Sequence, residues 1–517
     1  MEFKINRETV PAAECIYDGI QEQSVELDYI LPDYYPDIFR LIRCRIEPVI
    51  TNSSINGDKL NYELRCDIKV LYCGEEDTVI RCVSQTQSFS KTVDIGRDCD
   101  NAAIELIPKT GFVNYRAVNK RRLDIRGAVS VKIKVTGEKE QEVITDAEGM
   151  NIQLRKMPVR FAAKTMTIEK VMRISEETEL SPAQPSIMSI IGVRCTANDI
   201  ENKLISGKLL VKGELEAKVL YACESDGEGA AELMVFSLPF SQIMDIDEID
   251  ESFDCSITTE VVSCDVTPAS GKNGDNRMLR CEAELRIKCS AVKTGSAMLV
   301  TDAYSTVYPC ELSISEIKTE QIPVIYSESF RSNVRIAEGE QVPEKVYAMW
   351  CVPKNINTRI ADDGHSVVIT GMLTYSMAAK DASGMMIMPD KDEAFEETIE
   401  LGDDISGSSL TSDIKVREVS YNITSEGILS AKADISAEIS VSGSSVVNAV
   451  TDISIDDTAK KERDGDYSMK LYYGAENEDI WDIAKRYSTS VDAVREENDI
   501  DGDKIENGGM LLIPIIN

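Results

Sequence analysis

The chain has 517 residues, more than one hydrophobic core accommodates, so we expect roughly three or four domains. It is 43% hydrophobic and 28% charged, which is typical of a folded protein. Asp and Glu number 90 against 56 Lys and Arg, and the resulting formal charge of −34 argues against binding to nucleic acid or anionic lipid. A protein partner with basic patches fits this surface better.

The N-terminal sequence MEFKINRETVPAAEC lacks the basic and apolar regions of a signal peptide. No uninterrupted apolar run of about 18 residues occurs, so no transmembrane helix is expected. These two features predict a cytoplasmic protein. The 14 cysteines include no C-x-x-C pair, which favours reduced, buried and unpaired thiols over a zinc site or a disulfide framework.

A long internal repeat organises most of the chain. Residues 36–72 recur without a gap as 185–221, and both segments begin with proline and end in K-V-L-Y. A weaker third copy begins at Pro343, 158 residues after Pro185 (343 minus 185). A period of this size is a domain rather than a solenoid unit. We therefore predict three tandem copies of one domain, at residues 1–165, 166–320 and 321–455.

Within each copy, apolar and polar residues alternate, which is the pattern of strands with one buried face. Turn sequences such as INGDK and DDGH separate these runs. Many half-buried strands with few helical stretches predict a mainly β protein, whose copies are antiparallel β-sandwiches or barrels. The pattern leaves both topologies open. The predicted buried positions include Leu64, Cys66, Ile68, Val70, Tyr72, Val129, Val131, Ile133, Val135, Ala433, Ile435, Ala437, Ile439 and Val441.

No segment carries a recognisable catalytic motif. The chain lacks a P-loop, a dinucleotide-binding glycine motif, H-E-x-x-H and G-x-S-x-G. Its single histidine, His365, follows a turn sequence with no nucleophile or second histidine beside it, so we interpret it as a solvated turn residue. We expect no enzyme activity, no cofactor and no metal, and we assign no catalytic residue.

The third copy is followed by a different kind of sequence. Residues 456–469 are charged and lack apolar periodicity, so they are interpreted as a linker. Residues 470–517 then have the order strand, helix, helix, strand, with strand-like MKLYYG and MLLIPI at the two ends. Asp479 is the expected N-cap of the first helix. The predicted buried stripe of that helix comprises Ile480, Ile483, Ala484 and Tyr487.

This C-terminal segment resembles the LysM family over residues 470–515. In glycan-binding members of that family a G-D-T loop before the first helix helps to form the groove for N-acetylglucosamine chains. Here the loop is Asn477, Glu478 and Asp479, so the glycine is lost and two carboxylates face an acidic glycan. The residues that carry the resemblance are Tyr472, Ile480, Trp481, Ile483, Ala484, Tyr487, Asn498, Ile500, Ile505, Gly508, Gly509, Leu511, Ile513 and Pro514.

The three upstream copies resemble the DUF3794 family, also called the SPOCS domain. The resemblance is carried by L-P-D-Y-Y-P-D-I at 31–38, V-L-Y at 70–72 and K-I-K-V-T-G at 132–137. Tandem SPOCS copies with a C-terminal LysM domain are similar to the SipL-like, SpoIVA-interacting family of spore morphogenesis proteins. The resemblance implies a scaffold in the mother-cell cytoplasm that binds a SpoIVA-like ATPase and other coat proteins, and tethers the coat to the forespore surface. The alternative is a protein that binds peptidoglycan in the spore cortex or cell wall.

Trp481 is the most informative residue of the C-terminal segment, because it lies at the margin of the buried helical stripe. One interpretation is that its ring covers the small core, since tryptophan is often only partly buried. The other is that an exposed edge of the ring anchors a protein partner. On the second interpretation the two neighbouring loops supply the rim. The predicted partner site then comprises Asn477, Glu478, Asp479, Ile480, Trp481, Asn498, Asp499, Ile500 and Asp501.

Overall fold

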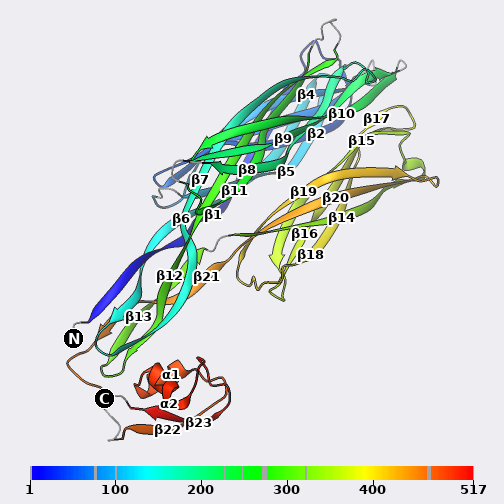
Figure 1. Ribbon diagram of the computed structural model, residues 1–517. Coiled ribbons are helices and arrows are strands. Elements are labelled where there is room, and N and C mark those ends of the chain that lie inside the picture. Colours follow the sequence, from blue (N-terminus) through cyan, green and yellow to red (C-terminus); the bar gives the residue numbers. More distant parts are fainter. Residues whose placement is uncertain are drawn as a thin grey trace.

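The computed structural model describes residues 3–74, 79–98, 102–205, 207–225, 228–246, 249–269, 276–320, 323–462 and 467–515. It is mainly β with antiparallel sheets, which confirms the predicted fold class. Its two α-helices both lie in the small C-terminal domain, at one end of an elongated molecule (Figure 1). Within the described ranges, no helix combines the length and apolar character needed to cross a membrane.

The first copy is built from two three-stranded antiparallel sheets, β1-β6-β5 and β2-β3-β4, which enclose one apolar core. The residues predicted to be buried in its strands are confirmed: Leu64 and Ile133, from opposite sheets, have no exposed surface. The strands are β1 (Lys4–Ile30), β2 (Ile38–Asn56), β3 (Lys59–Gly74), β4 (Ile80–Asp94), β5 (Ala103–Asn119) and β6 (Arg122–Glu148).

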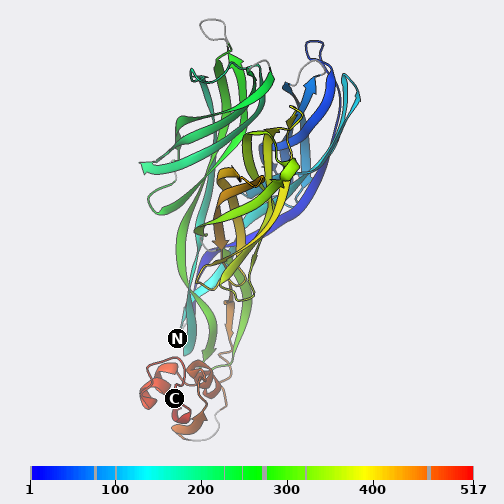
Figure 2. The same ribbon diagram turned by 90° about the vertical axis from the view of Figure 1, so that its right-hand side faces the viewer.

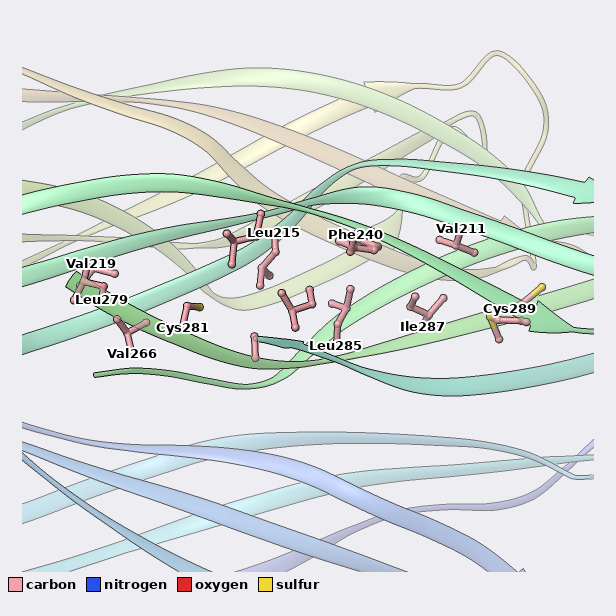
Figure 3. Packing of buried hydrophobic residues seen from close by; sticks show 14 of the residues in the cluster. Val211, Leu215, Val219, Phe240, Val266, Leu279, Cys281, Leu285, Ile287 and Cys289 are labelled. Atoms are coloured by element: carbon pink, nitrogen blue, oxygen red, sulfur yellow. The ribbon is translucent and has the colours of Figure 1, made fainter. Parts of the chain in front are cut away.

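The second copy repeats this arrangement with sheets β7-β12-β11 and β8-β9-β10. Figure 3 shows its core, in which Leu215 and Phe240 of one sheet face Leu285 and Ile287 of the other. The strands are β7 (Ile152–Glu179), β8 (Ser189–Ile205), β9 (Lys208–Ser225), β10 (Glu228–Asp245), β11 (Phe253–Ala269) and β12 (Met278–Ser305).

The third copy has sheets β14-β20-β19 and β15-β16-β18, with the short β17 also paired to β16. Its long outer strands are divided, so that β13 and β21 form a separate pair. The elements are β13 (Cys310–Glu320), β14 (Val324–Glu338), η1 (Gly339–Gln341), β15 (Lys345–Ile360), β16 (Ser366–Lys380), β17 (Met386–Ile387), β18 (Asp390–Glu400), β19 (Ser409–Ile423), β20 (Ile428–Ser442) and β21 (Ser444–Ile455).

All three copies contribute strands to one further hydrophobic core outside the sandwiches. The outer ends of β1 and β6, of β7 and β12, and the pair β13–β21 form three two-stranded ribbons, which meet in the narrow part of the molecule (Figures 1 and 2). Their common core contains Val10, Val143, Val159, Phe161, Ala297, Leu299, Ile317, Val447 and Ala449. Because β7 runs unbroken from this bundle into the second sandwich, the domain limits drawn from the sequence at 165, 320 and 455 stay predictions.

The first two copies share a specific hydrogen bond. The Tyr72 hydroxyl donates to the carbonyl of Pro36 over 3.2 Å, and the Tyr221 hydroxyl donates to that of Pro185 over 3.3 Å. Pro36 lies just before β2 and Pro185 just before β8, as Pro343 does before β15. We call the sheets that begin with these strands, β2-β3-β4, β8-β9-β10 and β15-β16-β18, the inner sheets. The third copy has Ala379 where this tyrosine would stand, so the bond is lost there.

One cysteine pair departs from the sequence prediction. Cys195 of β8 and Cys264 of β11 form a disulfide across the second sandwich, so the expectation of unpaired thiols is wrong for these two residues. They are 69 positions apart, and the packing of β8 against β11 brings their Cα atoms to 6.5 Å. The other described cysteines are free and most are buried, Cys66 and Cys281 among them, as expected.

The C-terminal domain consists of β22 (Met469–Gly474), α1 (Ile480–Tyr487), α2 (Val491–Asn498) and β23 (Gly509–Pro514), which confirms the predicted βααβ order. Residues 463–466 of the proposed linker lie outside the described part of the chain. The small core contains Ile480, Ile483, Ala484 and Val494, together with Tyr304 from β12. The domain therefore packs directly on the ribbon bundle.

Candidate partner-binding site in the C-terminal domain

The loop before α1 has a well-defined backbone. Asn477 adopts a left-handed conformation with φ of 66°, a position that favours glycine and that asparagine also tolerates. Asp479 accepts a hydrogen bond from the Trp481 amide over 2.9 Å, which confirms it as the N-cap of α1. The turn thus keeps its left-handed residue although the glycine is absent.

Glu478 is bound inside the domain. Its carboxylate accepts hydrogen bonds from the Tyr472 hydroxyl over 2.6 Å and from the Ala475 amide over 3.1 Å, with Arg486 at 3.7 Å. The Tyr472 hydrogen bond is the main reason that the pKa of Glu478 lies below its usual value. The negative charge of this loop is therefore partly compensated.

The backbone of the same loop pairs with the segment before β23. The amides of Asn477 and Ile480 donate to the carbonyls of Ile505 and Asp503 over 2.8 and 2.9 Å, and the Ile505 amide donates to Glu478 over 3.0 Å. These backbone amides and carbonyls are therefore already hydrogen-bonded within the domain. They leave the loop few free backbone donors for an extended ligand.

The second predicted loop has a mainly structural role at its start. The Asn498 side chain donates to the Leu512 carbonyl and accepts from the Leu512 amide, both over 2.7 Å, so it joins α2 to β23. Asp499 takes the left-handed C-cap position, and Ile500 packs on the core. Of the predicted rim residues in this loop, only Asp499 and Asp501 are exposed.

Trp481 is buried against the ribbon bundle. Its ring is 7% exposed and meets Tyr304 edge-to-face, with 5.0 Å between ring centroids. The indole Nε1 donates to Oδ2 of Asp302 over 2.7 Å. The structure therefore differs from the expectation of an exposed edge, because the ring lies between its own domain and the end of β12.

Further polar contacts surround this ring. The Lys485 ammonium donates to both carboxylate oxygens of Asp302 over 2.7 Å, and Arg155 of β7 pairs with Asp479 over 2.7 Å. The Tyr304 hydroxyl donates to the carbonyl of Thr489, also over 2.7 Å. We call this set of contacts, including Trp481, the C-terminal junction. It places two predicted site residues, Asp479 and Trp481, in an interface within the chain.

Comparison with protein-family models identifies these domains. The description "SipL, SPOCS domain" matches residues 37–110 and 186–268, and "LysM domain" matches residues 475–514. The chain carries SPOCS and LysM domains. The two SPOCS segments begin 149 residues apart (186 minus 37), which equals the offset between Pro36 and Pro185. No curated protein and no solved structure matches the chain.

These matches support a role in sporulation and a C-terminal module of the peptidoglycan-binding class. The matched LysM segment contains both predicted loops and both helices. The matched SPOCS segments cover β2 to β4 in the first copy and β8 to β10 in the second, together with β11 and part of β5.

The LysM domain has an exposed apolar surface that the sequence analysis did not identify. Met469, Leu471 and Tyr473 of β22 point away from the helices, with exposed fractions of 43, 68 and 74%, and Met510 of β23 is 69% exposed. Leu471 lies opposite Leu512, and Tyr473 lies opposite Met510. We call these residues the outer sheet face. The period-two alternation in M-K-L-Y-Y-G was the signal that could have revealed it.

Proposed function

We propose that this chain is a non-enzymatic scaffold of spore-coat morphogenesis, located in the mother-cell cytoplasm at the forespore surface. Its LysM domain binds a SpoIVA-like ATPase, and the SPOCS sandwiches contact other coat proteins and tether the coat. The family matches support the setting in sporulation. The ATPase partner and the location follow from the resemblance to the SipL-like family.

The outer sheet face is the observation that best supports binding of a protein partner. Exposed apolar side chains that adjoin one another are a mark of protein-binding surfaces. Leu471, Tyr473 and Met510 form such a surface. The strand β22, which carries the first two, lies on the side of the domain away from the bundle (Figure 1). Around it the chain is acidic, so a partner with basic residues beside an apolar patch fits best.

Peptidoglycan binding is the second candidate. The LysM match itself favours it, and Asn477 preserves the left-handed residue of the loop. The charges of Glu478 and Asp479 are also compensated by Arg486 and Arg155, which reduces their repulsion of an acidic glycan. Against it stand the loop backbone groups that are already bonded within the domain.

The experiment compares the two candidates with the full chain. Capture of the SpoIVA-like ATPase from sporulating cells is measured beside sedimentation with purified peptidoglycan. Leu471→Asp should reduce ATPase capture by on the order of tenfold or more, because it charges the outer sheet face without entering the core. Phe112→Asp is the control, since it places the same charge on an exposed apolar residue of the first copy.

Loss of capture with Leu471→Asp but not Phe112→Asp, without glycan sedimentation, supports the scaffold. Sedimentation with peptidoglycan and no capture of the ATPase would establish the glycan-binding alternative. Trp481→Ala, measured by circular dichroism as well as capture because the ring is part of the small core, separates the two surfaces of the LysM domain. If the partner contacts Trp481 after the junction opens, this variant weakens capture by about 2 kcal/mol, whereas Asp302→Ala, which loosens the junction and keeps the tryptophan, does not.

A further inference from the structure

The inner sheets of the three copies face one another at a second junction. Their outward-facing apolar residues form one cluster, to which each copy contributes: Leu71, Cys73, Val79, Ile80, Ile191, Leu220, Ala222, Ala231, Ala348, Ala378 and Met386. Polar contacts cross the same boundary, since Ser189 donates to the Ile80 carbonyl over 2.8 Å and Arg43 to the Met388 carbonyl over 2.9 Å. We call this region the three-sheet junction.

In the first two copies, two positively charged side chains lie opposite each other on neighbouring strands at this junction. Arg45 lies directly opposite Lys69 on the neighbouring strand, and at the equivalent positions of the second copy Arg194 lies opposite Lys218. Like charges directly across a strand pair destabilise a sheet. The corresponding strand of the third copy, β15, has no cation at this place: Val352 lies 158 residues after Arg194 (352 minus 194), and Trp350 lies opposite Ser376. The fold itself therefore does not require these cations.

Most cations of the region have a carboxylate partner. The ion pairs are Arg43–Asp390, Lys69–Glu47 and Lys218–Glu216. Arg45 and Arg194 differ, because neither forms a hydrogen bond or an ion pair with any residue in the described part of the chain. Arg45 makes a cation–π contact, with its guanidinium carbon 5.9 Å from the centre of the Trp350 ring.

The two guanidiniums are only partly compensated by nearby charges. Burial lowers the pKa of both, and the like charges of Arg43 and Arg194 lower the pKa of Arg45 further. The Glu47 carboxylate, which is hydrogen-bonded to Lys69, offsets part of this effect at both arginines, and Asp390 does so at Arg45. Both arginines lie opposite lysines whose strands continue into the three-sheet junction at Leu71 and Leu220. Next to Arg45, the buried Nε1 of Trp350 has no acceptor among the described residues. Unmatched donors are costly when they are removed from water.

We propose that Arg45 and Arg194 bind a small oxyanion of the phosphate class at the three-sheet junction. A guanidinium presents a planar pair of N–H donors that matches phosphate oxygens. In a chain with a formal charge of −34, two such groups that form no hydrogen bond to a carboxylate among the described residues are a local exception. Because they come from different copies, an anion held between them also links the first sandwich to the second. The ligand is free phosphate or the phosphate group of a small phosphomonoester.

The test titrates the full chain with inorganic phosphate at constant ionic strength, chloride being the reference anion. We expect saturable binding by calorimetry, a rise in the thermal unfolding midpoint, and a change in tryptophan emission caused by Trp350. Arg45→Gln and Arg194→Gln should each weaken binding by about tenfold or more, the effect of losing one charge-assisted interaction. A parallel titration with phosphoserine distinguishes a phosphomonoester from the free ion.

The matched control is Arg173→Gln, which removes an exposed arginine of the second copy that pairs with Glu284. It lowers the total charge equally and should leave binding unchanged. Trp350→Phe should abolish the emission change and retain the thermal shift. The proposal is overturned if chloride acts as phosphate does, if Arg173→Gln weakens binding as much as Arg45→Gln, or if the Arg45→Gln, Arg194→Gln double variant binds like the original chain.

Discussion

The C-terminal junction and the three-sheet junction both join domains, but they differ in whether their buried hydrogen-bond donors have acceptors. The two tryptophans show this contrast. The indole N–H of Trp481 donates to Asp302, whereas that of Trp350 has no acceptor among the described residues. Cations follow the same division, since Lys485 is paired with Asp302, whereas Arg45 forms no ion pair within the described ranges. An interface whose polar groups are matched can be held by the chain alone, while at the three-sheet junction the proposed oxyanion would supply acceptors.

The largest expected effect is at Trp481. Trp481→Ala removes a buried ring that contacts Tyr304 and should lower the unfolding free energy of the LysM domain by about 3–5 kcal/mol. Hydrogen exchange at the amides of α1 and α2 measures this loss. Tyr473→Ala, at an exposed position in the same domain, is the control and should change protection by no more than about 0.5 kcal/mol. Unchanged protection in Trp481→Ala would show that the ring does not close the junction.

A second comparison contrasts a paired arginine with an unpaired one on the same strand. Arg43→Gln removes a buried guanidinium that donates to Asp390 and to the Met388 carbonyl, and should cost about 1–3 kcal/mol in urea unfolding. Arg45→Gln removes a charge that has no hydrogen-bond or ion-pair partner among the described residues, so in phosphate-free buffer it should cost less or stabilise the protein. Equal losses for both variants would contradict the distinction between the two residues.

Asp302 gives a smaller effect at the C-terminal junction. Asp302→Asn keeps an oxygen acceptor for the Trp481 indole but removes the charge that pairs with Lys485. Because Lys485 is 41% exposed, solvent screens this pair, and the expected cost is about 1 kcal/mol or less. Hydrogen exchange in α1 is again the measurement. A loss as large as that of Trp481→Ala would assign the stability of the junction to charge rather than to ring packing.

The smallest effect appears only at alkaline pH. Burial raises the pKa of the Tyr304 hydroxyl, which donates to Thr489, above its usual value of 10.0. The folded state therefore retains a proton that the unfolded state loses, and the stability of the junction falls as pH rises above about 10. Tyr304→Phe should remove this part of the pH dependence in unfolding experiments at pH 8–11. The same slope in Tyr304→Phe would assign the titration to another group.

The sequence alone was sufficient for everything that depends on local periodicity. Alternation along β3 predicted the burial of Leu64, Cys66 and Ile68, and helical spacing predicted that of Ile480 and Ile483. The N-cap at Asp479 was also predictable, because capping depends on a residue and the amides that follow it. The candidate site was only partly predictable, since Asp479 and Trp481 were identified but their partners were not.

The tertiary structure decided which surfaces meet. Trp481 packs on Tyr304 and Asp302, almost 180 positions earlier in the chain, and no spacing rule connects them. The same holds for the Cys195–Cys264 disulfide. Alternation shows that Arg45 points away from its own core, but only the packing of three sheets shows that Trp350 of the third copy lies beneath it. Periodicity reports which side of a strand or helix is buried, while the identity of what covers that side is fixed by contacts distant in sequence.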